Sequence, residues 1–126
     1  MQITQRLAAG PILVLSVAGR LDNVGSDQFR EQAMEQIRSG VRAVIVDFCE
    51  TTYVASMGIR ALFIPAQELA KHKGRMVLTG LSRDIRSLFV TAGLMDLFDV
   101  FDSVESAMAD PGWGPLLKKP GERLFP

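Results

Sequence analysis

The sequence predicts an α/β fold: one domain with a mixed β-sheet, an N-terminal antiparallel hairpin followed by parallel crossovers, and about four flanking helices. Short apolar, β-branched segments alternate along the chain with segments whose apolar residues recur at the spacing of one helix face. Residues 8–11 alone separate the first two strand candidates, which suits a hairpin, whereas helix-length segments separate the later ones. With 126 residues, 48% of them hydrophobic, the chain can bury a core without disulfides.

The N-terminal hairpin is predicted from two apolar segments and the turn between them. Residues 2–7 form a weak strand candidate and residues 12–17 a strong one, and a glycine and a proline between them mark the turn. A helix should follow from Ser26, whose hydroxyl can cap it, to about residue 39, where Gly40 provides the stop. The apolar side of this helix consists of Phe29, Ala33 and Ile37.

The centre of the chain is predicted to hold a buried strand, a loop and a second long helix. Residues 43–48 are apolar and rich in β-branched side chains, as strands buried on both faces of a sheet are. A loop over residues 49–55 then leads to a helix over about residues 57–72. Pro65 lies well inside this helix, so we expect a kink or an interruption about one turn before it.

The last third of the chain continues the alternation of strands and helices. Gly74 should end the second long helix, and residues 75–79 form the next strand. Ser82 caps a further helix, and residues 98–101 form a short strand. A last helix begins with a capping box over residues 102–105, in which the glutamate can reach back to the amide of the cap. The apolar face of the helix after Ser82 consists of Ile85, Leu88, Phe89 and Ala92.

Residues 1–110 are predicted to form the domain and residues 111–126 a C-terminal tail. The tail holds four of the six prolines and three glycines, so it can continue neither a helix nor a central strand. It is too apolar for a plain linker, so part of it should pack on the domain or on a neighbour. The apolar residues concerned are Trp113, Leu116, Leu117, Leu124 and Phe125.

Composition excludes several classes of function and location. The chain has 14 lysines plus arginines and 14 aspartates plus glutamates, so no net charge attracts nucleic acid or an anionic membrane. Cys49 is the single cysteine and cannot form an internal disulfide, and the N-terminus lacks the pattern of a signal peptide. No apolar run approaches the roughly 20 residues that span a bilayer. We therefore expect a soluble cytoplasmic protein that neither inserts into membranes nor binds nucleic acid.

The polar residues also argue against an enzyme, a metal site and a cofactor. His72, the only histidine, falls at the polar end of a predicted helix, and Cys49 has no neighbouring cation that would activate its thiol. The sequence contains no glycine-rich phosphate loop. Ser56 and His72 lie at opposite ends of one helix, about 24 Å apart at roughly 1.5 Å per residue, so they cannot form a hydrolase pair.

Ser56 lies between the buried strand and the second long helix, and the residues alone leave two interpretations of it. Its hydroxyl can cap the helix. An exposed hydroxyl at a helix start is also a good phosphorylation site, because free backbone N–H groups and the helix dipole favour a phosphate there. Gly58 suits both interpretations, since a missing side chain allows another protein to come close.

The second long helix has apolar residues on two sides. One set should face the sheet, and a second set, Met57, Ala61 and Ile64, lies on the outward side. Either another helix or the tail covers this second set, or it forms a docking face beside Ser56. Met57 would be a deformable contact on such a face.

Short motifs at the strand ends and helix starts form a set. They are Gly19-Arg20-Leu21-Asp22, Val46-Asp47, Ala55-Ser56-Met57-Gly58-Ile59-Arg60, Gly74-Arg75-Met76-Val77-Leu78, Leu88-Phe89, Ala92-Gly93-Leu94 and Phe98-Asp99. In this order the set resembles the STAS domain of the bacterial anti-sigma factor antagonist family. The resemblance covers about residues 2–109 and leaves the tail outside.

The resemblance implies a partner-switching protein with no catalytic activity. In the family, a motif serine is phosphorylated by a partner that is both anti-sigma factor and serine kinase, and a PP2C-type phosphatase restores it. The unphosphorylated form binds the anti-sigma factor. The serine falls on Ser56 and the motif glycine on Gly58, and a monomer or weak dimer is expected. The partner-binding set implied is Asp22, Asn23, Ala55, Ser56, Met57, Gly58, Arg60 and Ile64.

Two residues of the motif depart from the family pattern. Ala55 stands where an aspartate or serine is usual, and Met57 stands where a serine, threonine or small residue is usual. These departures favour an alternative function, in which an unphosphorylated STAS subunit binds a transporter ATPase or a sensory complex as a structural element.

Overall fold

The computed structural model describes residues 1–8 and 11–117, which fold around a six-stranded sheet. The main path through the sheet is β1-β2-β3-β5-β6, and β4 pairs with β2 off this path. β1 and β2 are antiparallel and the other strand pairs of the described residues are parallel, so the predicted mixed sheet with its N-terminal hairpin is confirmed. The strands are β1 (Gln2–Ala8), β2 (Ile12–Leu21), β3 (Ala43–Asp47), β4 (Thr51–Val54), β5 (Arg75–Thr79) and β6 (Asp99–Phe101).

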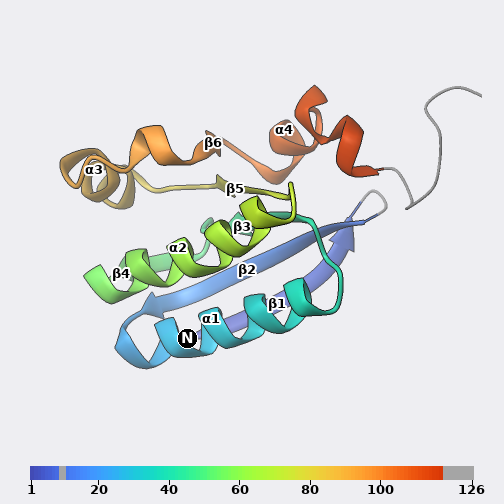
Figure 1. Cartoon of the computed structure of the whole chain (residues 1–126). Helices are drawn as coiled ribbons and strands as arrows, with labels where there is room; N and C mark the ends of the chain where they lie inside the picture. Colours follow the sequence, from blue (N-terminus) through green and yellow to red (C-terminus); the bar gives the residue numbers. More distant parts are fainter. Residues whose placement is uncertain (9–10, 118–126) are drawn as a thin grey trace, which may run out of the picture.

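Four α-helices flank the sheet in the described ranges, as expected. Figure 1 shows α1 and α2 lying side by side along the sheet, and it places α4 next to β6. Short 3-10 helices occur at Met95–Leu97 and Pro111–Leu117. The α-helices are α1 (Asn23–Arg38), α2 (Ser56–Lys71), α3 (Arg83–Thr91) and α4 (Val104–Met108).

The central strands β2, β3 and β5 are buried on both faces of the sheet, and their alternate residues point to opposite sides. On one face, Leu13 and Leu15 of β2 join a large apolar cluster to which α1, α2 and α3 contribute. On the other face, Ile12 and Val14 join a smaller cluster formed with α4 and Trp113. The near-continuous apolar runs of the central strands are therefore explained by helices on both sides.

The predicted loop over residues 49–55 contains a strand, which corrects the sequence-based expectation. β4 pairs in parallel with the end of β2, and Leu21 lies opposite Val54. A strand of four residues is too short to show a hydrophobic period in the sequence. The same pairing explains why β2 extends to Leu21, beyond the predicted end at residue 17.

Two predicted helix caps are wrong, that of α1 by four residues and that of α4 by one. α1 begins at Asn23, and its cap is Asp22, whose Oδ1 accepts a hydrogen bond from the Gly25 amide at 2.9 Å. Ser26 instead lies buried inside the helix, where its hydroxyl donates to the Asp22 carbonyl. α4 begins after Ser103, which forms a capping box with Ser106, so the box predicted over residues 102–105 is wrong.

α2 continues through Pro65, so the expected interruption does not occur, and a kink there stays a prediction. A proline inside a helix removes one backbone hydrogen bond and costs about 3 kcal/mol. Leu62 and Leu69 on the same helix are fully buried, and each contributes roughly 1.5–3 kcal/mol, which offsets that cost. Tertiary packing therefore keeps the helix intact across the proline.

The end of α2 also differs in detail from the prediction. Lys73, with φ of 60°, is the left-handed residue, and the Gly74 amide donates to the Leu69 carbonyl at 2.7 Å. Gly74 is needed for another reason, since a Cβ there would lie 2.6 Å from the Arg42 carbonyl oxygen. Glycine therefore marks the helix end in the sequence because two backbone segments approach closely at this point.

α3 is capped by Ser82 as predicted, but only half of its predicted apolar face is buried. Ile85 and Phe89 are in the core, whereas Leu88 and Ala92 are exposed. α3 has nine residues, and only a narrow side of this short helix meets the sheet cluster.

The segment after residue 110 packs on the domain, which was one of the two predicted options. Trp113 is 1% exposed, and its Nε1 donates to the Ala107 carbonyl at 2.7 Å. The Arg75 guanidinium lies 4.7 Å from the Trp113 ring centroid and forms ion pairs with Asp99 at 2.9 Å and Asp110 at 2.8 Å. The predicted turn at residues 9–10 and the predictions for Leu124 and Phe125 lie outside the described residues.

Candidate functional site

The predicted site is formed where two neighbouring strands end and two helices begin. β2 ends at Leu21 and its parallel neighbour β4 ends at Val54. The Ala55 amide donates to the Leu21 carbonyl at 2.9 Å, which joins the two chain segments directly after the strands. Asp22 and the start of α1 therefore lie beside Ala55 and the start of α2. The structure brings together site residues that are more than 30 positions apart in the sequence.

Gly58 fixes how closely the two segments approach. A Cβ at this position would lie 2.8 Å from the Leu21 carbonyl oxygen and 2.9 Å from Leu21 Cγ. Real Cβ atoms do not come so close, so α2 can sit against the end of β2 only because residue 58 is glycine. The close approach inferred from the sequence is thus made by the chain's own backbone. Gly58 itself is buried.

Ser56 is exposed and is the first residue of α2, so its interpretation as the helix cap is wrong. The cap position is taken by Ala55, which forms no side-chain cap hydrogen bond. Alanine has no acceptor for the amides of the first turn, which stay open to solvent or to another ligand. The two helix starts therefore differ: Asp22 satisfies an amide of α1, whereas the start of α2 has no side-chain acceptor.

The charges around Ser56 would tolerate an added negative charge within the chain. The first turn of α2 contains no acidic residue, and the helix dipole is positive there. Arg60 is exposed four residues later on the same helix side, within reach of a group on Ser56. On the adjoining strands, Arg20 stacks over the Tyr53 ring at 4.1 Å from the centroid, which holds a second guanidinium near this end of the sheet.

Arg20 belongs to the motif set found in the sequence, but its stacking on Tyr53 was not predicted. The two residues lie opposite each other on β2 and β4, and Tyr53 is 41% exposed. The signal that could have found them is the pairing of β4 with β2, which the sequence did not reveal.

A groove beside the site runs between α1 and α2. Met57 and Ile64 are 43% and 45% exposed, whereas Ala61 between them is buried. The first interpretation of the outward stripe is therefore confirmed in part, since α1 covers its middle. The ends of the stripe stay open, and a docking face there remains a prediction. The groove has a volume of about 340 Å³ and is lined by Ser26, Asp27, Arg30, Met57, Arg60, Ala61, Phe63 and Ile64.

The single cysteine and the single histidine, Cys49 and His72, do not line this groove. Cys49 is exposed, and the negative charge of Asp47 raises the pKa of its thiol, which disfavours the reactive thiolate. His72 is exposed near the end of α2, where its Nε2 lies 3.4 Å from Glu68, a neighbour that the sequence interpretation overlooked. In residues 1–8 and 11–117, three or more potential metal ligands do not come together. None of the helices in these ranges has the length and apolar character needed to cross a membrane.

The geometry separates Ser56 from a general base of the usual kind. His72 follows the last residue of α2 and Ser56 is the first, so the whole helix lies between them. At roughly 1.5 Å per residue this distance is about 24 Å, as expected from the sequence. What the arrangement offers chemically is an exposed hydroxyl at the positive end of a helix dipole, with Arg60 one turn away and an apolar groove beside it.

The chain is similar in sequence to a bacterial regulator. "Putative anti-sigma factor antagonist BtrV" of Bordetella bronchiseptica is 28% identical over 98 residues, which cover 78% of this chain and 84% of the relative.

Solved structures with a similar fold include regulators and a transporter protein. SpoIIAA, a Bacillus cell fate determinant, superimposes in its unphosphorylated form with a TM-score of 0.71 at 22% identity, covering 90% of this chain and 99% of SpoIIAA. Its phosphorylated form gives a TM-score of 0.69 at 22% identity, covering 85% and 96%. A sulfate transporter family protein from Wolinella succinogenes gives a TM-score of 0.72 at 16% identity, covering 89% and 91%.

The family assignment depends on the chain as a whole. A sequence model described as the STAS domain matches residues 4–107, which include most of β1, all of β2 to β6 and the start of α2. The strand order and the two helix starts described above account for this match. The chain belongs to the STAS domain family.

Proposed function

We propose that this chain is an anti-sigma factor antagonist that works by partner switching. It binds an anti-sigma factor with serine kinase activity while Ser56 is unmodified, and phosphorylation of Ser56 releases it. The observation that carries this proposal is the exposed Ser56 hydroxyl on the uncapped first turn of α2, next to the open groove between α1 and α2. The name of the BtrV relative and the two phosphorylation states in which SpoIIAA has been solved support it.

The proposed contact surface follows the joined helix starts. Asp22 and Asn23 contribute from the start of α1, and they are exposed there. From α2, exposed Met57 and Ile64 provide the apolar contacts and Arg60 the charge. Half-buried Ala55 leaves the first turn without a side-chain cap, and buried Gly58 holds the start of α2 close to β2. An apolar centre with a polar rim is the usual composition of a specific protein interface.

A phosphate on Ser56 would act as the off switch by its charge. It adds roughly two negative charges at the edge of an apolar contact. Docking would then remove water from this charge, and an uncompensated charge in an interface costs several kcal/mol. In the free protein the same charge is favourable, because the amides of the first turn and Arg60 can interact with it. Phosphorylation therefore weakens binding of the partner much more than it changes the stability of the fold.

The rest of the proposed cycle is supplied by other proteins in the cytoplasm. A PP2C-type phosphatase would remove the phosphate and restore binding. The chain itself would act without catalysis, cofactor or nucleic acid, as a surface whose charge another enzyme sets. Its balanced composition of 14 basic and 14 acidic residues fits this role.

A second candidate function is favoured by Ala55 and Met57 and by the fold likeness to the Wolinella succinogenes transporter protein. In this alternative, the same surface binds a transporter ATPase or a sensory complex, and Ser56 stays unmodified. Apolar Met57 beside Ser56 then serves only as a contact residue.

The test replaces Ser56 with aspartate and with alanine and measures binding to a cognate anti-sigma kinase. Ser56→Asp should weaken binding by at least about a hundredfold, because a charge is desolvated without a partner, whereas Ser56→Ala should bind within a few-fold of the wild type. Ser87→Asp, at an exposed position on α3, is the matched control for an added charge.

Equal binding of Ser56→Asp and Ser56→Ala would contradict partner switching. Incubation of the wild type with ATP and the same kinase, followed by mass spectrometry, separates the two candidates. A phosphate on the Ser56 peptide supports the switch. An unmodified peptide together with stable binding of a transporter ATPase supports the second candidate.

A further inference from the structure

The first strand of the sheet has an open edge along its whole length. In the described part of the chain β1 pairs with β2 alone, and the sheet order places it at one end. Its seven residues pair with β2 without a bulge, and they include no proline and one charge, Arg6. Proline, bulges and several charges are the features that protect edge strands from pairing with other chains. β1 has none of these except the single arginine.

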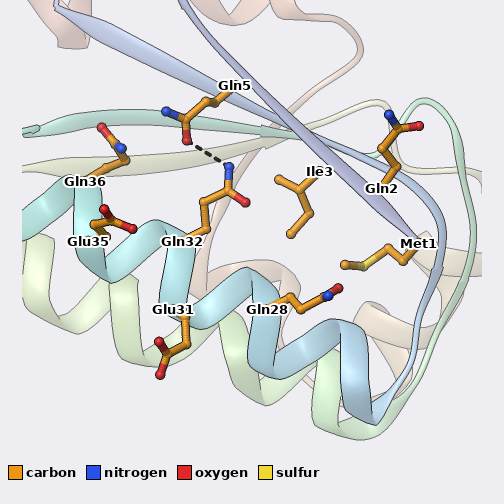
Figure 2. Close-up of a pocket in the computed structure, with 9 residues that line it drawn as sticks. All are labelled: Met1, Gln2, Ile3, Gln5, Gln28, Glu31, Gln32, Glu35 and Gln36. Atoms are coloured by element: carbon orange, nitrogen blue, oxygen red, sulfur yellow. Dashed lines mark hydrogen bonds between the residues drawn. The ribbon is translucent and has the colours of Figure 1, made fainter.

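The open edge is flanked by a groove between β1 and α1. The groove has a volume of about 700 Å³, and amide side chains form much of its wall. Figure 2 shows Gln28 and Gln32 reaching from α1 toward β1, where the Gln32 Nε2 donates to Gln5 Oε1 at 2.8 Å. This bond uses one group of each amide, so the NH₂ of Gln5 and the carbonyl oxygen of Gln32 can bond to a further partner.

We infer that β1 is a homodimer interface, at which β1 of a second copy pairs antiparallel with β1 and extends the sheet. A two-fold axis perpendicular to the sheet at Gln5 would place the two Gln5 residues opposite each other. Ile3 of each copy would then lie opposite Leu7 of the other, and Thr4 opposite Arg6. Leu7 is 67% exposed in the single chain, and this register covers it with an apolar side chain on the same face.

Neighbouring registers match less well. An axis at Arg6 would place two like charges directly opposite each other, which is destabilising. An axis at Thr4 would place Ile3 opposite Gln5. Leu7 would then lie beyond Gln2 of the second copy, where that strand begins, and would have no strand residue opposite it. Only side chains on the same face can be opposed, so axes between residues are excluded. The pattern of β1 thus favours the axis at Gln5 over these two neighbours, and a two-fold axis there makes the paired strands self-complementary.

The charges near the groove limit the strength of the dimer. Glu31 and Glu35 line the groove on α1 and have no basic residue beside them among its lining residues. A two-fold axis brings these carboxylates toward their copies, so association should be weak and should strengthen with added salt. Ser56 stays free in such a dimer. Its end of the sheet is the end where β1 begins, and antiparallel pairing directs the two sites away from each other.

The first test measures self-association of the full chain by sedimentation equilibrium over a wide concentration range. The wild type should show a dimer whose population rises with protein concentration. Leu7→Lys should weaken self-association by at least about tenfold, since two symmetric apolar pairs are lost. Val90→Lys, at a position on α3 that is 60% exposed, is the matched control and should leave it unchanged. A wild type that stays monomeric at every concentration overturns the inference, as does an equal effect of the two lysine variants.

The second test determines the register by cross-linking, in a Cys49→Ser background that removes the exposed native thiol. Gln5→Cys should form an intermolecular disulfide under mild oxidation, because residues directly opposite have Cβ atoms about 5 Å apart. Thr4→Cys should not, since its opposite residue is Arg6 of the second copy. Cross-linking of Thr4→Cys as fast as Gln5→Cys contradicts the proposed axis. Neither test depends on the proposed phosphorylation of Ser56.

Discussion

At the scale of single residues, Gly58 gives the sharpest prediction for the site. An added Cβ would meet Leu21 at 2.8 and 2.9 Å, so Gly58→Ala must push α2 away from the end of β2. We expect it to lower the free energy of unfolding by about 1–3 kcal/mol, the cost of overpacking a tight contact. The sign is informative, because glycine to alanine inside a helix otherwise stabilises by up to about 1 kcal/mol. Urea unfolding monitored by circular dichroism measures the change.

Gly114→Ala is the matched control for this substitution. A Cβ at Gly114 meets no atom within 4 Å, so its effect should stay within about 0.5 kcal/mol. If Gly58→Ala is as stable as the wild type or more stable, the contact with Leu21 does not determine the position of α2. The close approach at Gly58 would then not be what holds the two helix starts together.

The sequence located Ser56 at the start of a helix but did not give its role there. Local pattern could not choose between Ser56 and Ala55 as the cap of α2, or between Asp22 and Ser26 as the cap of α1. Both choices depend on where β2 and β4 end, and this is determined by the pairing of Leu21 with Val54. A contact between residues so far apart leaves no local signal. Cap propensities alone therefore misplaced one helix start by a few residues and the other by one.

At the scale of elements, the contact between β5 and the C-terminal 3-10 helix predicts a dependence of stability on pH. The hydrogen bond from Arg75 lowers the pKa of Asp110, and the Gly112 amide adds to this effect. A lowered pKa means that the carboxylate stabilises the fold above its ordinary pKa, near 3.9, and that this contribution is lost as the pH falls through the lowered value. Asp110→Asn should therefore be less stable than the wild type at pH 7, and the difference should shrink below about pH 4.

Thermal unfolding of both proteins between pH 2 and pH 7, in steps of about half a unit, tests this prediction. Asp102→Asn is the control, because Asp102 has a side chain that is 99% exposed and lies 3.9 Å from Arg86. Its difference from the wild type should be small at every pH, as for other exposed ion pairs. A constant difference between Asp110→Asn and the wild type across this range would show that the Asp110 charge is not what holds the contact.

The elements that were predicted best from the sequence have many residues that follow one regular apolar pattern, or a glycine or proline that marks their end. The hairpin, the central strands and the four helices were found because each has several residues of regular pattern. β4 was missed because four residues show no period, and the exposed Leu88 was assigned to the core because periodicity cannot tell how wide a helix face is covered. Which residues of the outward stripe on α2 stay exposed depends on where α1 packs. This is a tertiary contact that the local sequence pattern does not reveal.

At the scale of the whole molecule, the site and the proposed dimer edge use different parts of one sheet. Ser56 lies at the ends of β2 and β4, where two helices begin, while β1 lies along the side of the sheet. The resemblance to the STAS family could be drawn from the sequence because its motifs coincide with these strand ends and helix starts. The free edge could not, since a strand's position in the sheet order is not a property of its own residues.

The extent of the folded unit gives the last prediction. The sequence placed the end of the domain at residue 110, before the Pro111–Leu117 helix that carries Trp113. Trp113 is 1% exposed in the cluster on the second face of the sheet, and removing so large a buried side chain typically costs about 3–5 kcal/mol. Total stabilities of single domains are about 5–15 kcal/mol. A chain that ends at residue 110 should therefore lose a large part of its stability.

A chain that ends at residue 117 is the matched comparison, because it keeps Trp113, its hydrogen bond to Ala107 and its stacking with Arg75. Its free energy of unfolding in urea should exceed that of the 1–110 chain by about 3 kcal/mol or more. Amides of β5 should also exchange faster in the shorter chain, since Val77 of this strand belongs to the cluster that Trp113 covers. Equal stability of the two chains would mean that Trp113 adds nothing to the stability of the fold. The folded domain would then end at residue 110, as the composition of the tail suggests.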